Sequence, residues 1–419
     1  MSLGMDLRPH GLPEAAGDKF TRVLHKLIPE SWQQRFRDGG YARRLVDGLV
    51  TLSSVTMHEH ALRFMHLGNC QQSFRYASHE QCVLHILDIS SSLNDMHISD
   101  AMMSRNVLVF VHGGAWGSGK PWMYRLTAAG IGATLQARFV VLVEYPVYPN
   151  STVLQQRDCV SHAMRFIKSH DWEKLFASPR DTTHSHLNSR SATDSAAAPL
   201  RVILSGHSSG ANICALAMLH AAEHGLRLAD AFVGLCGVYD IQAHYEFERA
   251  RGVHVVSPMG AAAGPADRFW ASSPTLLLQH WPVTVAGQCH AYAQFLPCCL
   301  LLHGTADTTV PFTSSQRFAQ ELQKLRVPVC TAYPAVDHIQ PVFEFLTYEG
   351  SSSDSFAAGE QSLGPCVAAL TQWYTSNMGC APKAVQDKKI KTLSPQSVAA
   401  GDDQAVCIAE GDRLTKSKL

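Results

Sequence analysis

One stretch near the middle of the chain constrains its fold more than any other. Residues 201–212 read Arg-Val-Ile-Leu-Ser-Gly-His-Ser-Ser-Gly-Ala-Asn, an apolar run that leads into Gly-x-Ser-x-Gly and then into small residues. The pattern predicts a strand, a sharp turn and a helix, with the hydroxyl of Ser208 exposed at the turn. Side chains at Gly206 and Gly210 would collide where strand and helix close on each other. An ordinary glycine and serine turn is the alternative.

A nucleophilic serine needs a base and an acid that orients the base. When these follow the serine in the order acid, then histidine, Asp307 is the best candidate for the acid because it follows the strand expected at 297–302 by a short loop. The other carboxylates considered are Asp230, Asp240 and Asp267. Beyond Asp307 the chain contains a single histidine, His338, which is therefore the expected base. The neighbouring Asp337 is interpreted as a loop residue.

The reaction also needs hydrogen-bond donors for a developing negative charge. Residues 110–116, Phe-Val-His-Gly-Gly-Ala-Trp, end an expected strand with paired glycines, whose backbone N–H groups are unobstructed. Gly113, Gly114 and Ser209 are the expected donors. We interpret His112 as a support for this loop. The Gly-Ser-Gly-Lys at residues 117–120 lacks the full spacing of a phosphate-binding loop and is interpreted as a turn into the next helix.

The order of the expected elements predicts the α/β class. The expected strands lie at residues 82–89, 106–111, 139–145, 201–205, 231–237, 297–302 and 327–333. The expected helices between and after them lie at residues 122–136, 153–170, 209–226, 314–325 and 365–375. This alternation favours a mainly parallel central sheet with helices on both faces. We expect one α/β domain at residues 70–380, a helical extension at 1–69, and a polar, disordered tail at 381–419.

Two segments interrupt this alternation. Residues 176–198 are rich in Ser, Thr, His and Ala, which predicts a low-complexity insertion before the serine strand. Residues 239–294 look irregular and are a candidate lid. Their apolar clusters, Phe269-Trp270 and Leu276-Leu277-Leu278, fit either a hydrophobic wall for an acyl group or ordinary core.

Composition excludes several classes of function. The 35 basic residues balance the 35 acidic ones and are scattered, which argues against a nucleic-acid surface. We expect neither a secretory signal nor a transmembrane segment, because no apolar run approaches the necessary length. The 12 cysteines are expected to be reduced thiols, and no pair has the spacing of a zinc site. We predict no metal and no organic cofactor.

The sequence closes with Ser417-Lys418-Leu419, the tripeptide that the peroxisomal import receptor reads. The polar stretch before it would present this address. We therefore expect the import receptor as a partner and a peroxisomal location, of the glycosome type in organisms that have glycosomes. A cytoplasmic location is the alternative.

The motifs resemble a known family. His112-Gly113-Gly114-Ala115-Trp116, followed by Gly-His-Ser-Ser-Gly-Ala at 206–211, is similar to the carboxylesterase branch that includes kynurenine formamidases. The segment at 303–312, His-Gly-Thr-Ala-Asp-Thr-Thr-Val-Pro-Phe, resembles the acid loop of prenylcysteine carboxyl methylesterases. The resemblance covers most of residues 70–345. It implies the α/β-hydrolase fold, the triad Ser208, Asp307 and His338, and cleavage of the methyl ester of a prenylated cysteine.

The expected mechanism is two-step acyl transfer on a small, hydrophobic ester. His338, oriented by Asp307, deprotonates Ser208, and water later releases the acid from the acyl-enzyme. Three other functions are open: an arylformamidase acting on N-formylkynurenine, a lipid or steroid ester hydrolase, and a non-catalytic binding protein on the same scaffold. Such binding proteins usually lose the serine or the histidine, and this chain has both.

Overall fold

The computed structural model describes residues 58–69, 71–89, 104–169, 200–281, 291–347 and 363–378. All of these residues belong to one compact unit of the chain. The predicted insertion at 176–198, the tail at 381–419 with Ser417, Lys418 and Leu419, and all of the predicted extension except α4 (His58–Asn69) lie outside the described residues.

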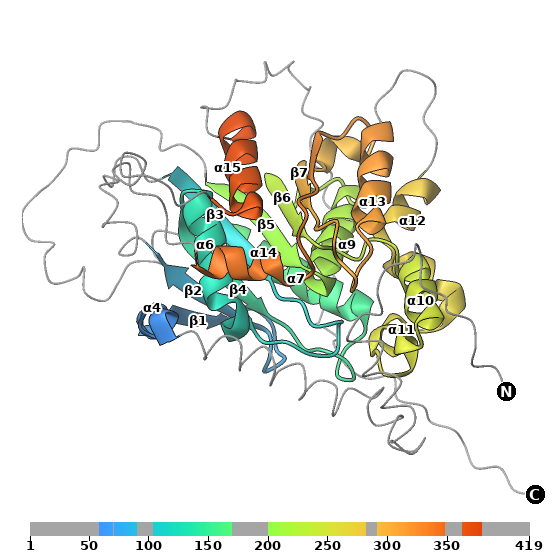
Figure 1. The fold of residues 1–419 in the computed structure, drawn as a ribbon, viewed down its shortest axis with the longest axis horizontal. Coiled ribbons are helices and arrows are strands. Elements are labelled where there is room, and N and C mark those ends of the chain that lie inside the picture. Colours follow the sequence, from blue (N-terminus) through green and yellow to red (C-terminus); the bar gives the residue numbers. More distant parts are fainter. Residues whose placement is uncertain are drawn as a thin grey trace, which may run out of the picture. The chain divides into compact units, whose positions relative to one another are not determined.

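An eight-stranded sheet forms the centre of the described domain (Figure 1). Its strands, in spatial order, are β1 (Gln71–Arg75), β2 (Val83–Asp88), β4 (Ala137–Glu144), β3 (Ser104–Val111), β5 (Arg201–His207), β6 (Ala231–Leu235), β7 (Cys298–Leu302) and β8 (Val329–Ala332). The first two pairings are antiparallel and all the others are parallel. The predicted α/β fold with a mainly parallel sheet is confirmed.

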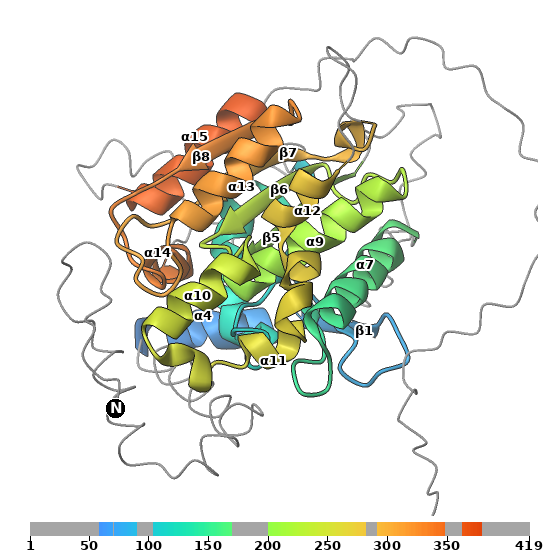
Figure 2. The ribbon, with the colours of Figure 1, turned by 90° about the vertical axis from the view of Figure 1, so that its right-hand side faces the viewer.

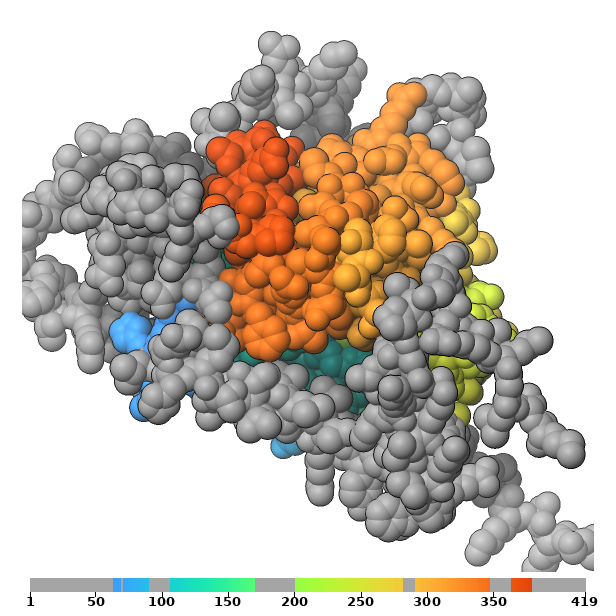
Figure 3. Space-filling view, in the orientation of Figure 1, coloured from blue at the N-terminus to red at the C-terminus, as the bar shows by residue number. Residues whose placement is uncertain are grey.

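Helices cover both faces of the sheet, as Figures 1 and 2 show. One face packs against α7 (Val153–Ser169), α9 (Ser209–Glu223), α12 (Pro274–His280) and α13 (Thr313–Lys324). The other packs against α4, α6 (Arg125–Thr134), α14 (Gln340–Thr347) and α15 (Pro365–Asn377). In the space-filling view, α15 (red) lies directly beside the orange surface of residues 313–347 (Figure 3).

The two hydrophobic cores follow from the alternation of side chains along buried strands. In β3, Val107, Val109 and Val111 point into one core, and Leu108 and Phe110 point into the other. A strand buried on both faces must be apolar at every position, which is why this run reads as continuous in the sequence. Within the described ranges, no helix combines the length and the hydrophobicity needed to cross a membrane.

The segment at 239–294 is more regular than predicted. Its described residues form α10 (Ile241–Ala250), α11 (Met259–Ala263), α12 and short 3₁₀ helices at Val253–Val255, Ala266–Ser272 and, at the end of the segment, Ala293–Phe295. Local signals explain the helices: Asp240 accepts a hydrogen bond from the Ala243 backbone N–H (2.9 Å) and caps α10, and Pro274 begins α12. Phe269 and Leu278 are core residues, whereas Trp270 is exposed. The expectation of an irregular segment was wrong, because short helices separated by Pro and Gly lack a long periodic pattern.

Candidate active site

The register of the parallel strands brings distant residues to one edge of the sheet. Val111 at the end of β3 pairs with Gly206 of β5, and His207 of β5 pairs with Leu235, the last residue of β6. Leu235 in turn pairs with Leu302, the last residue of β7. The segments that follow these strands therefore begin side by side at the carboxyl edge, where parallel sheets place their ligand sites.

Ser208 lies at the sharp turn between β5 and α9. Its backbone has φ 55° and ψ −123°, a conformation that residues other than glycine rarely adopt. Its N–H donates to the carbonyl oxygen of Leu235 at 2.8 Å, which fixes the turn to the neighbouring strand. A side chain on Gly206 would come within 2.6 Å of the backbone of Gly210. The predicted strand, sharp turn and helix are confirmed, and Ser208 is only half-buried.

Gly210 is required for a reason that the sequence did not suggest. A side chain at this position would collide with the backbone carbonyl oxygens of Val111 and His112, at the end of β3. The second glycine of the motif therefore allows α9 to approach the loop that carries Gly113 and Gly114.

This glycine loop lies against the serine. A side chain on Gly113 would lie 3.2 Å from the Ser208 Cβ and 2.8 Å from the His207 carbonyl oxygen. Gly114 has φ +133° and its carbonyl oxygen accepts hydrogen bonds from the backbone N–H (2.9 Å) and hydroxyl (2.8 Å) of Ser118. These bonds close the turn at 114–118, as predicted for the segment that leads into the 3₁₀ helix Pro121–Tyr124. The loop can therefore approach the Ser208 side chain closely.

His112 supports this loop, in agreement with the interpretation from the sequence. Its Nδ1 donates to the Gly113 carbonyl oxygen at 2.9 Å, since a carbonyl can only accept. Its ring stacks on Tyr145 with centroids 4.4 Å apart, and the Tyr145 hydroxyl donates to the His112 carbonyl oxygen (2.7 Å). Trp116 extends the support, because its carbonyl oxygen accepts from the Gln156 amide on α7 at 2.9 Å.

The structure brings Asp307 and His338 into direct contact. Asp307 Oδ2 lies 2.6 Å from His338 Nδ1, and both residues are buried. Asp307 Oδ1 accepts the backbone N–H groups of Thr309 and Val310, each at 2.8 Å. Burial alone would raise the pKa of the Asp307 carboxyl, but His338 and His303 hold this pKa well below its usual range. An ionised carboxylate can only accept, so His338 Nδ1 carries a proton, which leaves Nε2 as the ring nitrogen that can accept one.

His303 is a site residue that the sequence reasoning did not single out. It is fully buried at the end of β7. Its Nε2 lies 2.9 Å from the Val310 carbonyl oxygen and 3.1 Å from Asp307 Oδ2, and both of these atoms can only accept. Nε2 therefore carries the proton, and Nδ1 accepts from the Ser315 hydroxyl at 2.7 Å. His303 thus donates to Asp307 Oδ2, the same oxygen that His338 Nδ1 contacts.

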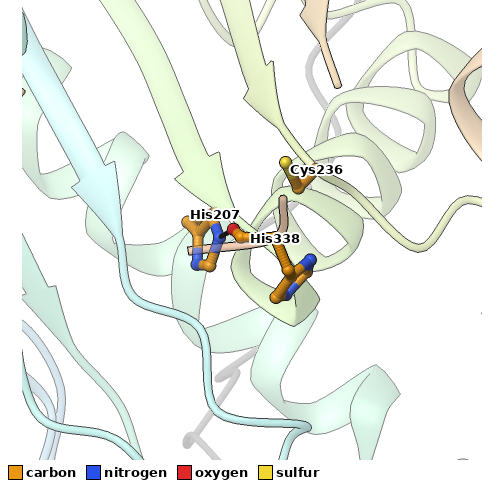
Figure 4. Close-up of side chains that lie close together, drawn as sticks. All are labelled: His207, Cys236 and His338. Atoms are coloured by element: carbon orange, nitrogen blue, oxygen red, sulfur yellow. Dashed lines mark hydrogen bonds between the residues drawn. The ribbon is translucent and has the colours of Figure 1, made fainter. Parts of the chain in front are cut away.

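Three further buried groups lie close to this pair. Figure 4 shows His207, Cys236 and His338 together, with the His207 ring joined to the His338 carbonyl oxygen. Cys236 follows β6, and burial together with the Asp307 charge raises the pKa of its thiol strongly. The thiol is therefore neutral, and its sulfur lies within 4.8 Å of an Asp307 carboxylate oxygen. Tyr124 contacts His207 from the other side.

The same side chains form the candidate metal-binding groups among the described residues. The donor atoms of His207, Cys236 and His338 lie within 4.8 Å of one another, and so do those of Cys236, His303 and Asp307. Most of their nitrogen and oxygen atoms are already engaged in the hydrogen bonds described above, and His338 Nε2 is the exception. A metal ion bound to Asp307 Oδ2 would compete with the contact between Asp307 and His338.

The remaining candidate acids lie in other roles. Asp240 caps α10, and Asp230 accepts the Val202 backbone N–H at 2.8 Å beside β5. Asp267 is exposed in a 3₁₀ helix. Asp337 is an exposed residue that accepts the N–H groups of Ile339 and Gln340 at the start of α14, which agrees with its interpretation as a loop residue.

Comparison with curated proteins finds plant relatives. The chain is 27% identical over 229 residues to the probable isoprenylcysteine alpha-carbonyl methylesterase ICME of Oryza sativa subsp. japonica, covering 52% of this chain and 47% of the relative. It is 26% identical over 228 residues to isoprenylcysteine alpha-carbonyl methylesterase ICME of Arabidopsis thaliana, covering 52% and 46%. The matched region spans about half the length of these curated relatives.

Solved structures resemble the fold at low sequence identity. A variant of the esterase rPPE has a TM-score of 0.55 at 15% identity, covering 87% of this chain and 97% of that one. A thermostable esterase from Pseudomonas putida ECU1011 has a TM-score of 0.50 at 16% identity, covering 81% and 95%. A family model described as alpha/beta hydrolase fold matches residues 108–341, which is more than half of the chain. The protein therefore belongs to the α/β-hydrolase fold family.

Proposed function

We propose that this protein is a serine carboxylesterase with Ser208 as nucleophile, His338 as base and Asp307 as the acid that orients the base. The observation that carries the proposal is the 2.6 Å contact between His338 Nδ1 and an ionised, buried Asp307. The contact lies at the sheet edge where β5 turns into α9 at Ser208. Ser208 and His338 are linked through His207, which precedes the serine in sequence and hydrogen-bonds to the His338 backbone.

The chemistry follows from this arrangement. His338 Nε2 takes the Ser208 proton as the hydroxyl oxygen attacks an ester carbonyl, and Asp307 stabilises the imidazolium that forms. Backbone N–H groups of Gly113, Gly114 and Ser209 stabilise the oxyanion. His338 then protonates the leaving alcohol, and water repeats the sequence to release the acid.

For the substrate we propose the methyl ester of a prenylated cysteine. The support is the name of the rice and Arabidopsis relatives together with the acid-loop motif at residues 303–312. Hydrolysis of N-formylkynurenine would use the same residues on a compact aromatic amide. A panel that contains farnesylcysteine methyl ester, N-formylkynurenine and p-nitrophenyl esters of increasing acyl length separates these substrate classes.

The serine mechanism is tested without knowledge of the substrate. We expect a fluorophosphonate probe to label the wild-type protein and not Ser208→Ala. Ser205→Ala is a matched control, because Ser205 is a fully buried serine of the same strand and should leave labelling intact. Labelling of Ser208→Ala at the wild-type rate would place the nucleophile elsewhere and overturn the proposal.

A further inference from the structure

His207 occupies the first of the two variable positions in the Gly-x-Ser-x-Gly motif. Its side chain connects parts of the site that are far apart in sequence. Its Nε2 lies 3.0 Å from the carbonyl oxygen of His338, 131 residues later in the chain. Its Nδ1 lies 3.1 Å from the hydroxyl of Tyr124, 83 residues earlier. The rings of His207 and His338 pack with centroids 4.8 Å apart (Figure 4).

The partners of His207 determine its tautomer. The His338 carbonyl oxygen can only accept, so Nε2 carries the proton and donates. Nδ1 then accepts from the Tyr124 hydroxyl. Burial, reinforced by the neighbouring His338, lowers the pKa of His207 to about 3, so the ring stays neutral at the pH where esterases work. Its neutral state and its tautomer suit a fixed hydrogen-bonding bridge and not a proton carrier.

We propose that His207 is a positioning residue that fixes the backbone of the His338 loop and, through Tyr124, couples this loop to the glycine loop. The inference rests on the proposed function of His338 as the base. Asp307 holds the His338 side chain at Nδ1, and His207 holds the backbone of the same residue, so the base is fixed at two points. On the other side, the Tyr124 hydroxyl bonds to His207 and lies against the glycine loop, since a side chain on Gly113 would come within 3.1 Å of it.

Two amide substitutions separate the two bonds of His207. Gln places an N–H donor near the position of Nε2 and can still reach the His338 carbonyl. The Asn side chain is one methylene group shorter than that of Gln. Its amide can therefore accept from the Tyr124 hydroxyl but cannot reach the His338 carbonyl oxygen. We expect His207→Asn to lower kcat about 10- to 100-fold with KM changed less than about threefold, since a misplaced base affects chemistry more than binding. His207→Gln should recover most of kcat.

The assay is p-nitrophenyl acetate hydrolysis together with the rate of fluorophosphonate labelling, which needs no natural substrate. Tyr124→Phe should lower the labelling rate less than His207→Asn, because it leaves the bond to His338 in place. His224→Asn, at an exposed position that caps the end of α9, is the control and should match the wild type. Circular dichroism and thermal melting identify any variant that is not folded.

Equal kcat in His207→Asn and the wild type would overturn the inference and leave the proposed function intact. Equal loss in folded Asn and Gln variants would also overturn it, because a donor to His338 would then be irrelevant. If the wild-type protein itself is neither labelled nor active, the proposed function fails first. Selective recovery by Gln supports the positioning role.

Discussion

The neutral, buried state of His207 makes the stability of the protein depend on pH in a specific way. The titratable groups near its ring are Tyr124, Cys236, His338, Asp307 and His303. Burial lowers its pKa to about 3 in the folded protein, whereas a histidine in an unfolded chain titrates near pH ~6.5. Between these two values the unfolded chain binds more protons than the folded one. The contribution of His207 to the free energy of unfolding therefore falls as the pH falls below about 6.5.

The size of this effect follows from the two pKa values. Moving from pH 7 to pH 5 protonates almost all of the unfolded His207 and almost none of the folded residue. The linkage relation then gives a loss of about 2 kcal/mol in the free energy of unfolding from this residue alone. His207→Gln removes the titrating ring, so the variant should lose about 2 kcal/mol less than the wild type over the same pH interval.

Urea unfolding followed by tryptophan fluorescence at pH 7 and pH 5 measures the difference, provided that unfolding is reversible at both pH values. Comparing each protein with itself at the two pH values cancels any stability change caused by the substitution at pH 7. His224→Gln, on the exposed end of α9, is the control and should show the wild-type pH dependence. An equal decline in the wild type and His207→Gln would show that His207 does not remain neutral in the folded protein.

Three further predictions concern single contacts. Asp307→Asn should lower kcat about 10³- to 10⁴-fold in steady-state assays while the protein stays folded. The reason is that an amide can donate to His338 Nδ1 and favour the wrong tautomer of the histidine. A decrease in kcat below about tenfold would exclude Asp307 as the orienting acid. Gly210→Ala should destabilise the protein by about 3 kcal/mol or more in urea unfolding, or prevent folding. The added Cβ would collide with the backbone carbonyl oxygens of Val111 and His112. A Gly210→Ala variant as stable as the wild type would contradict the close approach of α9 to β3. Asp240→Ala should cost about 1 kcal/mol of stability through the lost cap of α10 and leave kcat unchanged; a lower kcat would instead connect α10 to the reaction.

Sequence reasoning predicted the inner parallel strands, β3 to β7, well because they are buried on both faces. Each of them is a continuous apolar run that ends at a distinct turn, and the structure moves their boundaries by only a few residues. It missed β1, a polar edge strand of half-exposed and exposed residues, because an edge strand needs no continuous hydrophobic pattern. It also missed α14, whose residues were assigned to no element and follow the His338 loop directly.

Parts of the candidate site could be predicted for a similar reason. Glycines and a serine at fixed spacing predict a turn from local steric requirements, and a single remaining histidine leaves no choice for the base. The roles of His303 and Cys236 depend on which strand ends meet, and that depends on the strand order. The sequence did offer a signal for His303, which directly follows an apolar strand. A buried histidine there must find hydrogen-bond partners, because burial without them costs the full desolvation free energy of its ring. Tyr124 offered none.

His207 shows why residues that support a site are harder to predict than residues that carry out the chemistry. Its place in the motif is called variable because the turn at Ser208 needs only glycines and a serine. The structure shows that the end of β5 lies against both the His338 loop and Tyr124, so the side chain at this position must satisfy one buried carbonyl and one buried hydroxyl. A neutral imidazole has one donor and one acceptor at suitable positions, whereas an apolar side chain would leave both partners unpaired at a cost of about 1–3 kcal/mol each. The choice of histidine is thus determined by two loops that the motif does not contain, and any other residue accepted here must offer the same donor to His338.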